Sequence, residues 1–393
     1  MKWICCQLGA REHYAVPRAL QLSDLLGEFI TDVWTKRLTG RFHPGLAHAN
    51  VRAPNISALT FALKAQATGV NGWNLITQRN EWFQQQALDH LHKQPANGSR
   101  TVFAYSYAAE RIFKFARERG WRLVLGQIDP GPAEEQRVAQ LHAEALQNHW
   151  QPAPAEYWNS WRNECALADQ IVVNSSWSRE ALLSEGVPAE KVSVVPVAYE
   201  AALESTLYER DYPADFTSQR PLRVLFLGQI NLRKGVGHLF DALKLLEREN
   251  VEFWFVGPTQ MSLPSDFRKH ARVKWFGVVP RSQVHEYYKK ADVFVFPTLS
   301  DGFGLTQLEA QSWKLPVVAS RHCGEVVCDG VNGVILEEVS GQAIAVVLRQ
   351  FLRSPEILKA MSTRSGVDDR FSLRKLAASL TDLGSEHRSE FNL

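Results

Sequence analysis

The chain has 393 residues, enough for two domains of ordinary size with a hydrophobic core in each. Its 45% hydrophobic and 22% charged residues are typical of folded globular proteins and exclude an intrinsically disordered chain. With 44 basic and 42 acidic residues the net charge is only +2, so we expect no nucleic-acid partner.

The first residues, 1–12, contain an apolar run too short for a signal peptide, and charged residues follow it closely. No apolar run elsewhere is long enough to cross a bilayer, so any membrane contact is expected to be peripheral. The five cysteines have no zinc-ligand spacing and leave one unpaired. We therefore predict a reduced, cytoplasmic protein without a metal site, with peripheral association with a membrane as the alternative.

Short β-branched and aromatic segments alternate with helical stretches along both halves of the chain, which is typical of parallel sheets covered by helices. In the first half the predicted strands are residues 3–7, 101–105, 122–126, 170–174 and 192–197. In the second half they are residues 222–227, 252–256, 273–276, 293–297, 316–319 and 333–336. Apolar residues from Val236 to Leu246 recur with the period of one helix face.

A stretch rich in proline and polar residues, 198–221, interrupts both periodicities. We therefore predict an α/β fold of two Rossmann-like domains, residues 1–200 and 221–371, joined by a linker at 201–220. A last helix, within about 372–393, is expected to pack on either domain. The two parallel sheets are expected to face each other across a cleft.

The first informative motif is the segment 225–235, a strand that ends at Gly228 and leads through Arg233, Lys234 and Gly235 into a helix. Helix N-termini present free N–H groups and the positive end of the helix dipole, so this segment predicts a phosphate site. Arg233 can donate to two oxygens, whereas Lys234 acts as a point charge. The alternative is two solvated cations before a helix.

The second motif is the segment 296–310, in which another buried strand ends in a glycine turn and a helix. Gly302 and Gly304 allow backbone N–H groups to approach an anion closely. Asp301 before the helix and Glu309 in its second turn are expected to line one cleft and to accept hydrogen bonds from sugar hydroxyls. The alternatives are a helix N-cap for Asp301 and a solvated position for Glu309. Gln307 replaces the third glycine of a dinucleotide-binding fingerprint.

Four motifs occur in order over about 110 residues, and together they resemble the family-4 retaining glycosyltransferases of the GT-B fold, also called group 1 glycosyltransferases. They are Arg233-Lys234-Gly235, the acidic pair from Asp301 to Glu309, a strand at 316–320 and a Gly-Glu-Val-Val run at 324–333. The first domain would then bind the acceptor and the second the donor.

The resemblance implies that Arg233 and Lys234 neutralise the diphosphate of a nucleotide-sugar donor, a UDP-sugar or a GDP-sugar, and that Glu309 binds its ribose. Asp301 would lie near the transferred sugar, and Arg233, Lys234, Asp301 and Glu309 are the predicted catalytic residues. The donor-binding set is completed by positions that line the base, the phosphates or the sugar: Gly9, Gly228, Val278, Gly302, Phe303, Gly304 and Leu305. No bound cofactor is implied.

The chain departs from the family pattern in three places. Asp301 stands where glutamate is usual, and Gln229 where arginine is frequent, which transfers diphosphate binding to Arg233 and Lys234. In the first domain residues 105–107 occupy the neighbourhood of a frequent histidine, so no catalytic base is named there. Acceptor contacts are predicted from loop position at Arg11, His13, Tyr105 and Asn74.

The predicted function is transfer of a hexosyl unit, with retention of configuration, to a glycan or a lipid-linked glycan. By analogy alone, surface polysaccharide or lipopolysaccharide biosynthesis is the expected setting. Two alternatives stay open: a nucleotide-sugar epimerase or hydrolase of the same fold, and a nucleotide-sugar binder without turnover. The sequence does not determine the oligomeric state.

Overall fold

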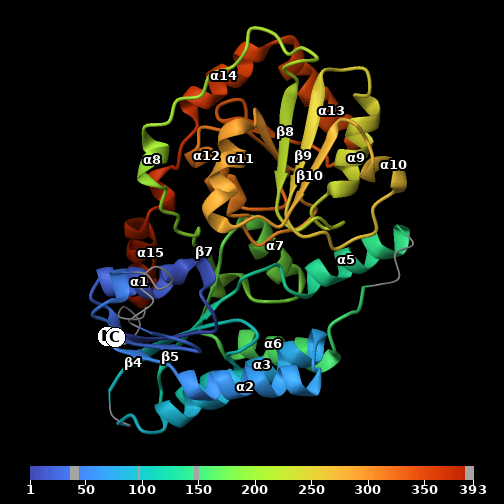
Figure 1. The fold of residues 1–393 in the computed structure, drawn as a ribbon. Helices are drawn as coiled ribbons and strands as arrows, with labels where there is room; N and C mark the ends of the chain where they lie inside the picture. Colours follow the sequence, from blue (N-terminus) through green and yellow to red (C-terminus); the bar gives the residue numbers. More distant parts are fainter. Residues whose placement is uncertain (36–43, 96–97, 146–149, 386–393) are drawn as a thin grey trace.

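The computed structural model describes residues 1–35, 44–95, 98–145 and 150–385. It contains two sheets, one of seven strands and one of six, and the paired strands within each sheet are parallel. Each sheet is covered by helices, and the C-terminal domain lies above the N-terminal domain in Figure 1. The predicted α/β architecture of two parallel sheets is therefore confirmed.

The N-terminal sheet has the strand order β3-β2-β1-β4-β5-β6-β7. In chain order its strands are β1 (Lys2–Gln7), β2 (Leu26–Thr31), β3 (Val51–Arg52), β4 (Arg100–Tyr105), β5 (Arg122–Gly126), β6 (Gln170–Val173) and β7 (Val192–Val194). The helices of this half are α1 (Ala15–Leu22), α2 (Asn55–Thr68), α3 (Gly72–Leu91), α4 (Glu110–Glu118), α5 (Pro132–Glu144), α6 (Ala155–Leu167) and α7 (Ser176–Ser184).

The C-terminal sheet has the strand order β10-β9-β8-β11-β12-β13. Its strands are β8 (Leu222–Leu227), β9 (Val251–Val256), β10 (Val273–Gly277), β11 (Val293–Phe296), β12 (Val317–Ala319) and β13 (Gly333–Ile335). The helices in the second half of the chain are α8 (Leu203–Thr206), α9 (Val236–Leu245), α10 (Ser265–Arg268), α11 (Val284–Lys290), α12 (Thr306–Ser312), α13 (Gly341–Arg353), α14 (Pro355–Arg364) and α15 (Leu373–Ser385).

Both faces of the C-terminal sheet are buried, which explains its nearly continuous hydrophobic strands. In β8, Val224 and Phe226 pack in one core cluster, whereas Leu225 packs in the cluster on the opposite face. The apolar face predicted for α9 is buried on the first of these clusters, as Leu239 and Leu243 show. Helix α9 therefore fixes the loop that precedes it against the sheet.

Strands β2 and β3 were not predicted, because β2 lacks a plain hydrophobic pattern. It contains Gly27 and the buried Glu28. The Glu28 carboxylate is paired with Arg52 Nε at 3.2 Å and lies 2.9 Å from His90 Nε2. Burial of this acidic side chain thus depends on partners from β3 and α3, which lie far away in the sequence.

The segment between the sheets joins the core of the second domain through two aromatic residues. Tyr212 and Phe216 are buried beside β8, and Arg220 forms an ion pair of 2.6 Å with Asp292. The last helix, α15, packs against α1, beside the N-terminal sheet (Figure 1). The domain limits given above stay predictions, but the two sheets lie on either side of residues 201–220.

In each sheet successive strands are added outwards in one direction and then in the other, starting from an inner pair. This pair is β1 and β4 in the first sheet and β8 and β11 in the second. In open parallel sheets, ligands bind beyond the carboxyl ends of the strands at such a switch point. The loops after β8 and β11 contain both predicted motifs, the loop after β1 contains the acceptor candidates Arg11 and His13, and Tyr105 ends β4. The fold therefore brings them towards one region between the domains.

Candidate active site

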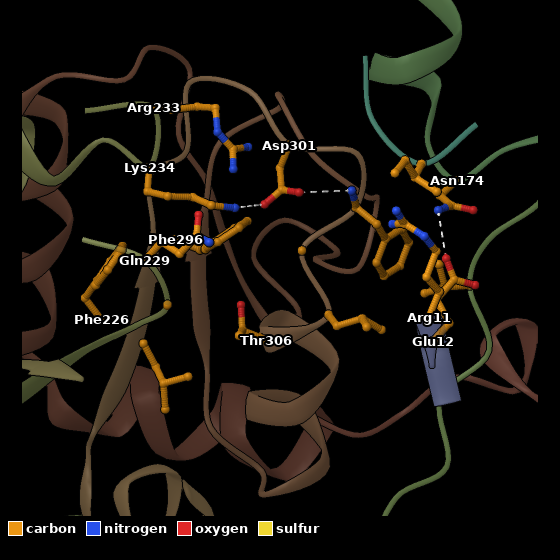
Figure 2. Close-up of a pocket in the computed structure, with 17 residues that line it drawn as sticks. Arg11, Glu12, Asn174, Phe226, Gln229, Arg233, Lys234, Phe296, Asp301 and Thr306 are labelled. Carbon is orange, nitrogen blue, oxygen red and sulfur yellow. Dashed lines mark hydrogen bonds and ion pairs between the residues drawn. The ribbon is translucent and has the colours of Figure 1, made fainter. Parts of the chain in front are cut away.

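A cavity of about 430 Å³ lies between the carboxyl ends of the two sheets. Figure 2 shows Arg233, Lys234 and Asp301 on the C-terminal side and Arg11, Glu12 and Asn174 on the N-terminal side. The cavity is lined by Arg11, Glu12, Ile128, Asn174, Val197, Phe226, Leu227, Gly228, Gln229, Arg233, Lys234, Phe296, Asp301, Phe303, Gly304, Leu305 and Thr306. Both predicted C-terminal motifs thus meet in one cavity, which we call the donor cavity.

The loop after β8 is held in a conformation that requires glycine. Gly235 precedes α9 with φ of +72°, and a Cβ atom there would overlap the carbonyl oxygen of Pro297. Within the same loop the Lys234 N–H donates to Asn231 Oδ1 at 3.0 Å. The close approach of Gly235 to the β11 loop sets Lys234 beside Asp301.

Lys234 and Asp301 form an ion pair inside the donor cavity, marked by a dashed line in Figure 2. Burial alone would raise the pKa of the Asp301 carboxyl, but the charges of Lys234 and Arg233 prevail and lower it below its ordinary value. Asp301 is therefore ionised at neutral pH, and it balances one of the two cations predicted for the diphosphate. The N-cap alternative does not fit, because α12 begins only at Thr306.

Arg233 is held by groups from both domains. Its Nη1 donates to the Ser300 carbonyl oxygen at 2.7 Å and lies 3.4 Å from Glu134 Oε2 of the N-terminal domain. Glu134 also accepts a hydrogen bond of 2.8 Å from the Ser300 hydroxyl. Burial raises the pKa of Glu134 to about 7, against the lowering effect of Arg233. Sequence reasoning missed Glu134, because nothing near position 134 indicates a partner at position 233.

The glycine turn after β11 divides its residues between two environments. Phe303, Gly304 and Leu305 line the donor cavity. Gly302 does not, because its backbone packs against Ile128 of the N-terminal domain and its carbonyl oxygen accepts from Ser175 Oγ at 2.7 Å. In this structure Gly302 serves a domain contact, which differs from the anion contact predicted for it.

Two further predicted donor contacts lie outside the cavity lining. Glu309 lies in the first turn of α12, one turn earlier than predicted, and accepts a hydrogen bond of 2.8 Å from the Tyr288 hydroxyl. Burial raises the pKa of its carboxyl above the ordinary value. Val278 is 75% exposed after β10. The structure therefore does not bring Val278 or Glu309 to the cavity wall.

The loop after β1 contributes Arg11 and Glu12 to the donor cavity. Glu12, His13 and Tyr14 all have positive φ angles, between 47° and 61°, a conformation costly for residues other than glycine. Burial raises the pKa of Glu12, which accepts a hydrogen bond of 3.3 Å from Asn174 Nδ2. Glu12 and Asn174 were not predicted as site residues, although Glu12 lies in the loop after β1 and Asn174 follows the last residue of β6.

A second cavity, of about 350 Å³, lies on the N-terminal side and shares Arg11 and Ile128 with the donor cavity. Its wall is mainly aromatic and polar: Cys6, Leu8, Gly9, Arg11, Trp73, Ile76, Arg79, Asn80, Phe83, Tyr105, Ser106, Tyr107, Ala108, Ile128, Asp129 and Tyr157. We call it the acceptor cavity, after the predicted role of Arg11 and Tyr105.

Gly9, which was predicted to bind the donor, lies in the acceptor cavity instead. Its N–H donates to Asp32 Oδ1 at 3.0 Å, so this amide is already paired. Asn74 is exposed on α3 and lines neither cavity, whereas its neighbour Trp73 lines the acceptor cavity. His13 is also outside both walls, and its ring contacts Arg281 of the opposite domain. Of the four predicted acceptor contacts, Arg11 and Tyr105 line the acceptor cavity.

Among the described residues, no group of three or more histidine, cysteine, aspartate or glutamate side chains is arranged to hold a metal ion. Within the same residues no helix combines the length and apolar character needed to span a bilayer.

The architecture is the GT-B fold. It resembles the structure of Anabaena Alr3699/HepE in complex with UDP, with a TM-score of 0.64 and 17% identity over 98% of this chain and 100% of that chain. Sucrose-phosphate synthase from Thermosynechococcus elongatus gives a TM-score of 0.68 with 17% identity, covering 99% and 100% of the two chains. At this level of identity the likeness establishes the fold.

Residues 210–366 match the family described as "Glycosyl transferases group 1". The match covers the C-terminal sheet and the helices around it, and the assignment of the whole chain to the group 1 glycosyltransferases, and within them to family 4, stays a prediction.

Curated relatives include the amylovoran biosynthesis glycosyltransferase AmsK of Erwinia amylovora, 27% identical over 45% of this chain and 46% of the relative. A D-inositol 3-phosphate glycosyltransferase of Xylanimonas cellulosilytica is 30% identical over 48% of this chain and 49% of the relative. The chain thus spans about half the length of these relatives.

Proposed function

We propose that the protein is a retaining glycosyltransferase that moves a hexosyl unit from a nucleoside-diphosphate sugar to a glycan or lipid-linked glycan. The observation that carries this proposal is the convergence of Arg233, Lys234 and Asp301 in the donor cavity, which opens beside the acceptor cavity. Two cations at the start of a helix match a diphosphate, and a separate cavity with aromatic walls matches a second sugar.

The donor is proposed to be a UDP-sugar. The choice over a GDP-sugar is supported by the Anabaena protein of the same fold, whose structures hold UDP, UDP with glucose, and UDP-glucose. Surface polysaccharide or lipopolysaccharide assembly is proposed as the setting, because AmsK is named for amylovoran biosynthesis and WaaB, a structural neighbour with a TM-score of 0.56, is named a lipopolysaccharide outer core galactosyltransferase. The proposed location is the cytoplasm.

As the bond between the anomeric carbon and the diphosphate oxygen breaks, negative charge builds on the leaving diphosphate. Lys234 and Arg233 would stabilise this charge in place of a divalent cation, as fixed donors do in an oxyanion hole. In this proposal the acceptor oxygen forms its bond to the anomeric carbon on the face that the diphosphate leaves, and its proton passes to a diphosphate oxygen. Isolation of a covalent glycosyl-enzyme would contradict this path.

The test is release of nucleotide from a panel of UDP-, GDP- and ADP-sugars, with and without a mixed glycan acceptor extract. We expect acceptor-dependent release of one nucleotide, and we expect Lys234→Ala to weaken nucleoside diphosphate binding by about tenfold to a hundredfold, as for loss of a charged hydrogen bond. Lys269, which is exposed and lines neither cavity, supplies the matched control Lys269→Ala.

Each alternative gives its own result in this assay. Release that needs no acceptor would indicate a hydrolase or an epimerase, and nucleotide binding without any release would indicate a binding protein. Either result would reject the transferase.

A further inference from the structure

Helix α2 is apolar on two opposite faces, although none of its residues is fully buried. Ile56, Leu59 and Leu63 lie on one face and are 82%, 61% and 56% exposed. At 100° per residue the opposite face is formed by Ala58, Phe61, Ala62 and Ala65. The face with Ala58, Phe61, Ala62 and Ala65 borders a groove beside α3 and is the one that bears on ligand binding.

The face of α2 that contains Phe61 forms one wall of a groove of about 690 Å³. Phe61 stacks on Trp82 of α3, with 5.3 Å between the ring centroids. The groove is lined by Asp32, Val33, Ala58, Phe61, Ala62, Ala65, Gln66, Gly69, Val70, Asn71, Leu75, Ile76, Arg79 and Trp82. Its two charged residues, Asp32 and Arg79, pair with each other at 2.9 Å, so the rest of its wall suits a hydrocarbon.

The groove continues into the acceptor cavity, because Ile76 and Arg79 line both. The far side of that cavity is polar and aromatic. Ser106 lies in its wall with a buried hydroxyl that has no hydrogen-bond partner among the described residues, a group that a ligand hydroxyl would satisfy. Tyr107 and Tyr157 stack there with 4.7 Å between their centroids, which offers a flat surface for a sugar ring.

We propose that the groove and the acceptor cavity together bind a lipid-linked acceptor, with its sugar in the acceptor cavity and its hydrocarbon chain between α2 and α3. The proposal rests on the proposed function and narrows its acceptor to one class. Continuity of an apolar groove with a polar cavity fits a ligand that is apolar at one end and polar at the other.

The experiment is calorimetric titration with hexyl, octyl and decyl glucoside, each kept below its micelle concentration. Affinity is expected to rise about fourfold for each methylene that enters the groove, with a negative heat-capacity change. Ala65→Trp fills the groove and should abolish this dependence on chain length. Ala67, exposed on the same helix and outside the groove wall, supplies the matched control Ala67→Trp, which should bind as the unmodified chain does.

Ala62→Phe, a smaller obstruction in the same wall, gives a second variant if Ala65→Trp does not fold. The proposal would be overturned if affinity did not depend on alkyl-chain length, or if Ala65→Trp and Ala67→Trp lowered the affinity for the glucosides equally. It would also be overturned if Leu63→Ser lowered this affinity while Ala65→Trp kept it, because the alkyl chain would then contact the outward face of α2.

The nucleotide panel, run on the same preparations, separates the two proposals. Transfer to a soluble glycan, without any dependence of affinity on the length of the alkyl chain, would refute lipid binding in the groove and leave the proposed transferase activity intact. Affinity that depends on alkyl-chain length, without nucleotide release, would support lipid binding in the groove and reject the transferase activity.

Discussion

The carboxylate of Glu134 in the N-terminal domain lies 3.4 Å from the guanidinium of Arg233 in the C-terminal domain, across 99 positions of sequence. This pair joins the proposed diphosphate-binding arginine to α5 of the opposite domain. Ser300 supports it from both sides, because its hydroxyl donates to Glu134 and its carbonyl oxygen accepts from Arg233. A donor that takes Arg233 must therefore compete with Glu134.

Glu134 should give the protein a measurable dependence of stability on pH. Its pKa is raised from 4.5 to about 7, so between these values the folded chain holds a proton that the unfolded chain has lost. The free energy of unfolding should then fall as the pH rises from 4.5 to 7, by at most about 3 kcal/mol. Urea titrations at several pH values should show a weaker fall in Glu134→Gln, whereas the exposed control Glu118→Gln should follow the unmodified protein. Parallel curves for all three proteins would contradict this prediction.

Asp301 should limit the affinity of the donor cavity for anions, because its carboxylate pairs with Lys234. Replacement by asparagine removes this competition and should tighten pyrophosphate binding by about fivefold, equivalent to about 1 kcal/mol. The same variant should lose transfer activity if Asp301 contacts the transferred sugar. Calorimetry with pyrophosphate tests the first part, with Asp266→Asn at an exposed position as control. Weaker pyrophosphate binding in Asp301→Asn would show that the carboxylate organises Lys234 and does not compete for it.

Glu309 is predicted to bind the ribose of the donor, although it lies behind the cavity wall and accepts from Tyr288 in this structure. Glu309→Gln should therefore weaken UDP binding by about tenfold and leave pyrophosphate binding unchanged, because pyrophosphate has no ribose. The two titrations on one preparation form their own control. An equal loss for both ligands would assign Glu309 a structural role.

Gly302 should be necessary for the contact between the domains. A Cβ atom at this position would overlap the Ile128 carbonyl oxygen, so Gly302→Ala should destabilise the protein by about 1–3 kcal/mol. Small-angle scattering should also show a larger radius of gyration, since the clash lies between the domains. In α9, Gly237→Ala meets no atom within 4 Å and should stabilise the protein by up to about 1 kcal/mol. A stable, compact Gly302→Ala variant would contradict the interface described here.

The sequence by itself determined the two parallel sheets, the face of α9 that packs on β8, and the two motifs at the carboxyl ends of β8 and β11. These features are local, because hydrophobic periodicity, glycine and charge are read within a window of about ten residues. Strand β2 was not predicted from the sequence, because its buried Glu28 depends on partners from β3 and α3.

The tertiary structure alone decided which residues meet between the domains. Glu12, Asn174 and Glu134 reach the proposed site only because two sheets face each other, and Gly302 turns from a predicted anion contact into a domain contact for the same reason. The contact between Glu134 and Arg233 is a property of how two separately folded cores pack. No local pattern at either position encodes it, since each residue alone is indistinguishable from a solvated charge near a helix N-terminus.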